Sequence, residues 1–226
     1  MTGSLVSPAT RQRVRDAAVP IARAMGRVGL TPNALTVIGF LGTCLAAVAA
    51  SQQAWLAAGV LVLAFGVFDL FDGALARATN RVSRFGAFLD SSLDRSGELV
   101  VYLGLLWGTL DLGLWLPDIL VAWAMAASTM VSYTRAKAES LGFTPGTGMA
   151  AVGLAPREVR LAILSVGLIV AGLLPGVPED TSGGAGGAAY PLSGMALDLT
   201  FGLIAILATI TTIQRILVVR TQAKEG

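Results

Sequence analysis

The chain has 226 residues, of which 54% are hydrophobic and 13% are charged, with a formal net charge of +2. Soluble domains carry about 25% charged residues, so this composition and a mean hydropathy of +0.73 exclude an ordinary soluble domain and indicate several membrane spans. The absence of histidine excludes a histidine metal ligand, base or phosphoryl carrier. The single cysteine, Cys44, excludes a disulfide within the chain and a cysteine-based zinc site.

The first element in chain order is a basic segment over residues 8–28, where five arginines are spread among Ala, Val, Ile and Met. This make-up is typical of an interfacial amphipathic helix whose cations meet anionic lipid headgroups. The same charges also act as a topology signal, and that role alone would explain them. The two interpretations are compatible.

Six apolar runs follow, each near the roughly 20 residues that a helix needs to cross the hydrocarbon layer. They lie at about 32–50, 54–79, 84–110, 116–138, 157–175 and 196–219. The expected fold class is therefore all-α: one integral membrane domain over residues 1–226, with six transmembrane helices and the N-terminal interfacial helix. The glycine-rich residues 182–187 indicate a flexible loop without chemistry of its own.

The distribution of charge predicts the orientation of these spans. All sixteen Lys and Arg residues fall in the N-terminal segment, the 77–95 region, the 135–160 region and the C-terminal segment. The charged residues in the connections between them are all acidic. With six spans, all the basic segments lie on one side, and the positive-inside rule makes that side cytoplasmic, together with both termini.

Four carboxylates stand out, because ionised side chains at membrane depth are costly and mark functional sites. Asp69 and Asp72 are three residues apart, and Asp90 and Asp94 are four apart, so each pair lies on one helix face. Four clustered acids repel one another unless cations neutralise them. Two such faces meeting would form an all-oxygen site for hard divalent cations.

Counting residues from the opposite membrane face places these acids at a common depth. Asp69 lies fifteen residues after Ala54, and Asp94 lies sixteen before Leu110. At about 1.5 Å per residue the two sets are level, so they can face each other. Basic residues of the last three spans lie at the same level, although snorkelling at the interface would also place them there. Glu98, one turn beyond Asp94, is a possible partner for Arg95 or for an arginine elsewhere.

The acidic segment reads Asp69-x2-Asp72-Gly73-x2-Ala76-Arg77-x8-Gly86-x3-Asp90-x3-Asp94. This pattern resembles the signature of the CDP-alcohol phosphotransferases, which are integral membrane enzymes of phospholipid biosynthesis. The resemblance implies attack of an alcohol on the β-phosphorus of a CDP-linked donor, typically CDP-diacylglycerol, with release of CMP. It also implies a homodimer in the plasma membrane, with an active site open to the cytoplasm, membrane lipids around it and no nucleic-acid partner.

The same resemblance implies roles for the residues of the motif. Two Mg²⁺ or Mn²⁺ ions would be held by Asp69, Asp72, Asp90 and Asp94, and Asp94 would also be the general base. The donor would be bound by Asp69, Gly73, Arg77 and Gly86. Gly73 and Gly86 could equally serve close helix packing.

Three basic segments point to the acceptor. The stretches 132–139, 156–161 and 211–215 look like those of the phosphatidylinositol-phosphate synthase branch, which implies that the acceptor is inositol phosphate. The residues expected to bind its phosphate are Ser132, Arg135, Lys137, Arg157, Arg160 and Arg215. Several cations suit a dianion better than a neutral alcohol. Glycerol 3-phosphate is also anionic, so a phosphatidylglycerophosphate synthase is the alternative.

A cation transporter is the alternative function from a different class of protein, because acids within a membrane can line an ion pathway. The two halves of the chain show no repeat, however, and the acids all lie in the second and third spans. The basic residues at the same depth would also repel the transported cation. A scaffold without activity would not need four aspartates.

Overall fold

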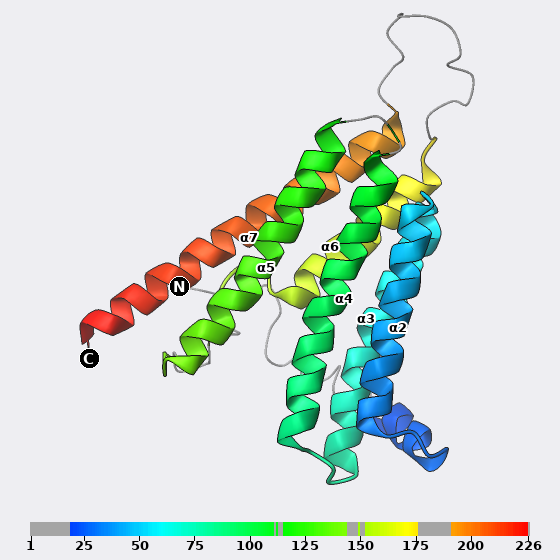
Figure 1. Ribbon diagram of the computed structural model, residues 1–226. Helices are drawn as coiled ribbons and strands as arrows, with labels where there is room; N and C mark the ends of the chain where they lie inside the picture. Colours follow the sequence, from blue (N-terminus) through cyan, green and yellow to red (C-terminus); the bar gives the residue numbers. More distant parts are fainter. Residues whose placement is uncertain are drawn as a thin grey trace, which may run out of the picture.

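The computed structural model describes residues 19–110, 112, 115–143, 149, 152–175 and 191–225, with only the backbone of Asp69, Leu70 and Glu225 (Figure 1). Within these ranges the chain is helical and has no strand. The main helices are α2 (Pro32–Ser51), α3 (Trp55–Ala78), α4 (Arg84–Leu110), α5 (Trp115–Ser140), α6 (Arg157–Leu173) and α7 (Leu192–Glu225). Each corresponds to one of the six apolar runs, so the all-α prediction is confirmed.

Local sequence signals set the helix ends. The Thr31 side chain accepts a hydrogen bond from the N–H of Ala34 at 3.2 Å, and Pro32 follows in the first turn of α2, where its missing N–H costs nothing. Gln53 and Asn80 adopt positive φ angles of 58° and 53° in the turns after α2 and α3. These short turns reverse the chain and make consecutive helices antiparallel.

Four helices, α2, α3, α5 and α7, are long and apolar enough to cross a membrane by themselves. The other two helices are not among these four: the first half of α4 carries the charged motif residues, and α6 has only 17 residues. The count of six spans therefore remains a prediction. Of the expected interfacial helix, residues 19–27 are helical, and the part before residue 19 lies outside the described residues, as does the glycine-rich 182–187 segment.

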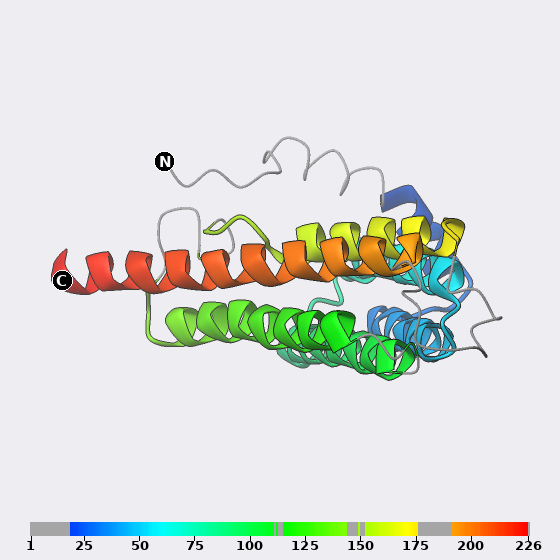
Figure 2. The same cartoon turned by 90° about the horizontal axis from the view of Figure 1, so that it is seen from above.

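The six helices pack as a closed ring. Around it, α2 contacts α3, α3 contacts α6, α6 contacts α7, α7 contacts α5, α5 contacts α4, and α4 returns to α2. Figure 2 shows α6 and α7, in yellow and orange, in a layer above the green α5. The first motif half, on α3, and the second, on α4, thus flank the same neighbour, α2.

The largest apolar core lies at one end of this ring. Its members come from the end of α2, the start of α3, the second half of α4, the start of α5, the second half of α6 and the start of α7, and include Ala50, Trp55, Leu105, Leu168 and Phe201. The motif residues lie toward the other ends of the same helices. In Figure 1 the lower ends of α4 and α5 lie well apart, whereas their upper ends are close.

Glycine allows α2 and α4 to approach closely near this core. A Cβ atom on Gly104 would overlap the backbone carbonyl of Ala47, and one on Gly108 would overlap that of Ala50. Without water to drive helices together in a bilayer, such backbone approach supplies much of the van der Waals contact. The α2–α4 contact therefore depends on these two positions.

This packing predicts that Gly104→Ala lowers the stability of the detergent-solubilised protein by about 1–3 kcal/mol, the usual cost of overpacking. Gly202→Ala on α7 is the matched control, because its Cβ would lie 4.0 Å from the nearest side-chain atoms, those of Leu120. Thermal unfolding compares the two variants. Equal melting temperatures would contradict the close α2–α4 contact.

Candidate active site

Asp72 is the most firmly held of the motif acids. Its side chain is buried on α3 and accepts a hydrogen bond from the Thr36 hydroxyl of α2 at 2.7 Å. The other carboxylate oxygen accepts from the backbone N–H of Gly73. Two donors to one carboxylate fix its direction. Thr36 stands among apolar residues of the first span, so nothing in the sequence singles it out as a partner of Asp72.

The other acids lie on α4 and at the preceding turn of α3. Asp90 and Asp94 are half-buried and share one face of α4, as their spacing predicts. The side chain of Asp69 lies outside the described residues. Among the side chains that the structure describes, no three carboxylates form a group that could hold a metal ion. The chemistry of the set is all-oxygen, which suits Mg²⁺ and Mn²⁺, and the role of the four acids stays a prediction.

Two glycines of the motif lie beside polar side chains. A Cβ atom on Gly73 would lie 3.3 Å from Nη1 of Arg77, so the exposed guanidinium lies over this glycine. A Cβ on Gly86 would lie 3.2 Å from Oδ1 of Asn33 and 3.1 Å from Oγ of Ser83. Both glycines leave space next to polar groups at the charged end of the ring. This arrangement agrees with the predicted donor site, which remains a prediction.

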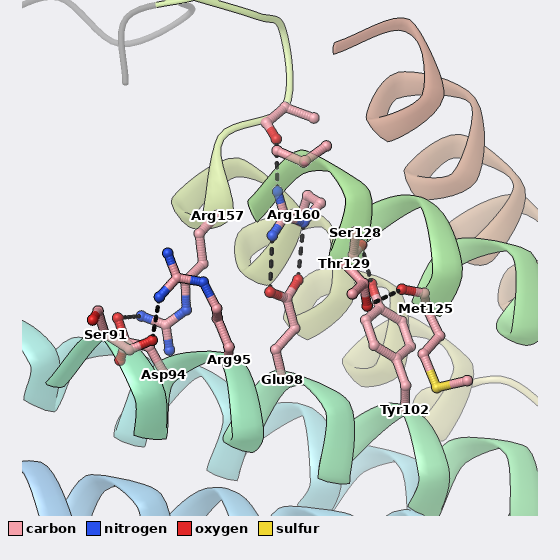
Figure 3. A network of polar contacts seen from close by, with 12 residues as sticks. Ser91, Asp94, Arg95, Glu98, Tyr102, Met125, Ser128, Thr129, Arg157 and Arg160 are labelled. Atoms are coloured by element: carbon pink, nitrogen blue, oxygen red, sulfur yellow. Dashed lines mark hydrogen bonds and ion pairs between the residues drawn. The ribbon is translucent and has the colours of Figure 1, made fainter. Parts of the chain in front are cut away.

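Two ion pairs connect α4 to α6 across the ring, and Figure 3 shows them side by side. Nη1 of Arg157 lies 2.8 Å from Oδ2 of Asp94, with both side chains partly exposed. One turn further along both helices, Arg160 donates from Nε and Nη2 to the two oxygens of Glu98 at 2.9 and 2.8 Å. Glu98 therefore has an arginine partner on α6, whereas Arg95 donates to the Ser91 carbonyl of its own helix.

Arg215 on α7 is buried and joins two other segments. Its Nε donates to the carbonyl of Val152 at 3.1 Å, and Nη1 donates to the carbonyl of Val131 on α5. One turn earlier, the Thr211 hydroxyl accepts from the N–H groups of Leu154 and Ala155 at 3.1 and 2.9 Å. Together, Thr211 and Arg215 hold the segment that leads into α6.

A positive φ of 114° at Gly153 completes this contact. A Cβ atom there would overlap the Thr211 side chain, so the segment before α6 can lie this close to α7 only with glycine. The resemblance of residues 211–215 marked this region in the sequence, but the partners of Thr211 could not be read from it.

The six residues expected to bind the acceptor phosphate differ in how far their side chains are exposed. Arg135 and Lys137 on α5 are exposed, with Nε of Arg135 3.0 Å from Oε1 of Glu139, and Arg157 and Ser132 are half-buried. The side chains of Arg160 and Arg215 are buried and engaged with protein oxygens.

Pockets lie on both sides of α5. Ser132 lines a pocket of about 310 Å³ between α4 and α5, together with Glu98, and Lys137 lines one of about 170 Å³ between α5 and α7. The basic side thus meets the acidic side through the Arg157–Asp94 contact.

Residues 29–214 match the model of the CDP-alcohol phosphatidyltransferase family, and they include the whole acidic motif, the first two basic segments and the third up to residue 214. The chain belongs to this family. It is therefore a CDP-alcohol phosphotransferase of phospholipid synthesis, and the transporter alternative is excluded.

Two curated relatives show which members of the family the chain resembles. The chain is 40% identical to the archaetidylinositol phosphate synthase of Pyrococcus horikoshii over 69% of its own length and 78% of that protein. It is 35% identical to the phosphatidylinositol phosphate synthase of Cutibacterium acnes, over 89% and 91% of the two chains.

Solved structures show the same fold. The phosphatidylinositol phosphate synthase of Mycobacterium tuberculosis with CDP-DAG bound superposes with a TM-score of 0.74 at 32% identity, over 90% of this chain and 94% of that one. A second structure of the same enzyme, in complex with manganese and citrate, gives a TM-score of 0.72 at 32% identity, over 90% and 89% of the two chains.

Proposed function

We propose that this enzyme transfers the phosphatidyl group of CDP-diacylglycerol to inositol phosphate and releases CMP. The observation that carries the proposal is the contact of Arg157 with Asp94, at 2.8 Å, which brings one of the expected acceptor-binding residues next to one of the motif acids. The names of both relatives support inositol phosphate as the acceptor, and the name of the Cutibacterium acnes relative and the CDP-DAG in the related structure support CDP-diacylglycerol as the donor.

In the proposed reaction, a hydroxyl oxygen of the acceptor forms a bond to the β-phosphorus of the donor. The bond from that phosphorus to the oxygen bridging the two phosphates breaks, and CMP leaves with the bridging oxygen. Asp94 takes the proton of the attacking hydroxyl, because it lies on the face of α4 that meets the basic residues. The chain has no histidine that could replace it.

The acids are proposed to hold two divalent ions, Mg²⁺ or Mn²⁺, through Asp69, Asp72, Asp90 and Asp94. When bound, such ions neutralise charge on the diphosphate and on the leaving CMP. Thr36 and the Gly73 N–H hold the Asp72 carboxylate in a fixed direction for this role. Arg77, exposed beside Gly73, adds a contact to the donor phosphates, with Gly86 leaving room at the start of α4.

The acceptor phosphate is proposed to bind at the three accessible cations, Arg135, Lys137 and Arg157, with the hydroxyl of Ser132 nearby. Guanidinium groups suit a phosphate dianion because they form paired charge-assisted hydrogen bonds. Arg160 and Arg215 are buried, and we assign them mainly to holding the basic segments in place while adding positive potential.

The membrane arrangement follows from the same distribution of charge. The described basic residues gather at the end of the ring that holds the motif, and by the positive-inside rule we propose that this end is cytoplasmic. The enzyme would then sit in the plasma membrane as a homodimer, with both termini and the active site on the cytoplasmic side. A site at the charged end gives access both to soluble acceptor and to a lipid donor.

The test of the proposed function is release of CMP from CDP-diacylglycerol by the purified protein with Mg²⁺ and one acceptor at a time. Inositol phosphate is expected to support turnover and free inositol to be a poor substrate, because a neutral alcohol leaves the cations uncompensated. Faster turnover with glycerol 3-phosphate would instead make the protein a phosphatidylglycerophosphate synthase. Equal rates with inositol and inositol phosphate would contradict an anionic acceptor site.

Chelation is the control in this assay. Excess chelator should abolish CMP release, and Mg²⁺ or Mn²⁺ should restore it, because an all-oxygen site prefers hard ions. Full activity in chelator would refute the proposed metal site.

A second prediction separates chemistry from binding within the motif. Asp94→Asn should cut kcat by about 10²-fold or more, the usual scale for a lost general base, while donor binding stays largely intact. Asp72→Asn should weaken metal and donor binding together. Binding of CDP-diacylglycerol and initial rates measure the two effects, and near-normal turnover of Asp94→Asn would exclude it as the base.

A third prediction concerns the accessible cations. Arg157→Gln or Lys137→Gln should raise the KM for inositol phosphate about ten- to a hundredfold, the worth of one charge-assisted contact. The KM for CDP-diacylglycerol should change much less, because the donor binds at the motif. Arg220→Gln is the matched control, since this cation lies beyond the site on the exposed last turns of α7. If the donor KM rose equally, the separate acceptor site would be wrong.

A further inference from the structure

The Glu98–Arg160 pair connects two helices that are not adjacent in the ring. Both side chains are buried, with 6% and 1% exposed. The pair is bidentate, at 2.9 and 2.8 Å, and Nη1 of Arg160 donates in addition to the carbonyl of Ala155 at 2.9 Å. One guanidinium thus holds both Glu98 of α4, as Figure 3 shows, and Ala155, which lies two residues before α6 begins at Arg157.

A buried ion pair adds little net stability over an apolar pair of similar size, because desolvation offsets the attraction. Its geometry is strict, however, because the guanidinium fork and the carboxylate must stay coplanar and in register. The pair is therefore better suited to fixing how two helices lie than to strengthening the fold.

The pair fixes the position of α6 relative to α4 next to the residues of the proposed active site. Glu98 lies one turn after Asp94 on α4, and Arg160 lies one turn after Arg157 on α6. Residues three or four apart share a helix face, so locking the inner pair also sets the outer pair. The outer pair is the contact of Arg157 with Asp94 at 2.8 Å, between a cation of the acceptor site and the general base.

We propose that Glu98 and Arg160 are positioning residues, which hold the acceptor-binding face of α6 at a fixed distance from Asp94. This inference rests on the proposed function, and it adds a determinant that lies outside the acidic motif. Glu98 touches neither substrate in this proposal. It acts through the placement of Arg157, and so affects how the acceptor hydroxyl meets the base.

The experiment compares Glu98→Gln with Glu98→Asp and with Glu158→Gln. Glu98→Gln leaves Arg160 without its charged partner and should raise the KM for inositol phosphate about tenfold or more, with a lower kcat, the effect of one lost charge-assisted contact. Glu98→Asp keeps the charge and should recover part of both losses. Glu158→Gln removes an equal charge from an exposed position of α6 and should stay within about twofold of the wild type.

A rise in the acceptor KM without a rise in the donor KM distinguishes a positioning role from a general structural role. The KM for CDP-diacylglycerol should remain near the wild-type value in Glu98→Gln, because α3 and the start of α4 are not held by this pair. Acceptor and donor KM values that rise together would overturn the proposal, as would Glu98→Gln constants equal to those of Glu158→Gln.

Two measurements keep the outcome interpretable. Donor binding gives the folded fraction of each variant, and rates are expressed per folded molecule. If Glu98→Gln does not fold, Glu98→Asp must raise the KM for inositol phosphate more than the KM for CDP-diacylglycerol, by a smaller factor, or the proposal fails. The wild type is assayed first with inositol phosphate, inositol and glycerol 3-phosphate. If another acceptor is preferred, the proposed function fails, and the two KM values are then compared with that acceptor.

Discussion

The cost of placing charge inside an apolar bundle is the constraint on which the rest of this structure depends. Asp72, Glu98, Arg160 and Arg215 are all buried, and each is held by polar partners from another segment. An ionised group without such partners would be neutralised or expelled toward water. The helices must therefore lie where their charges meet: α2 against α3 through Thr36, α4 against α6 through two ion pairs, and α7 against the segment before α6.

The same constraint explains why the two ends of the ring differ. At one end, small and apolar residues let the helices touch, as at Gly104 and Ala47. At the other end, charged side chains join the helices, as where Asp94 and Glu98 of α4 meet Arg157 and Arg160 of α6. In the proposed reaction the polar heads of the substrates would meet this charged end, and the apolar outer surface of the helices suits lipid chains.

The sequence predicted the helices well because length and hydropathy are local properties. The third expected span, 84–110, coincides with α4, and α7 runs past its predicted end at residue 219 to Glu225, over polar turns that hydropathy does not detect. The burial of Arg160 and Arg215 could not be predicted, because in the sequence both look like the other basic residues near the ends of the spans. Which cation faces solvent depends on how each helix is rotated about its axis. That rotation is set by contacts such as Thr211 with Leu154 and Ala155, which join distant parts of the chain.

The packing of the apolar core at one end has a mechanical consequence. A helix of 27 residues such as α4 is about 40 Å long, so a tilt of about 3° around the packed end moves the far end by about 2 Å. A tilt of α4 alone would lengthen the 2.8 Å contact of Asp94 with Arg157, so the two ion pairs make α4 and α6 move together. The apolar end is the pivot of such a tilt, and the ion pairs keep the charged ends of these two helices at a constant separation.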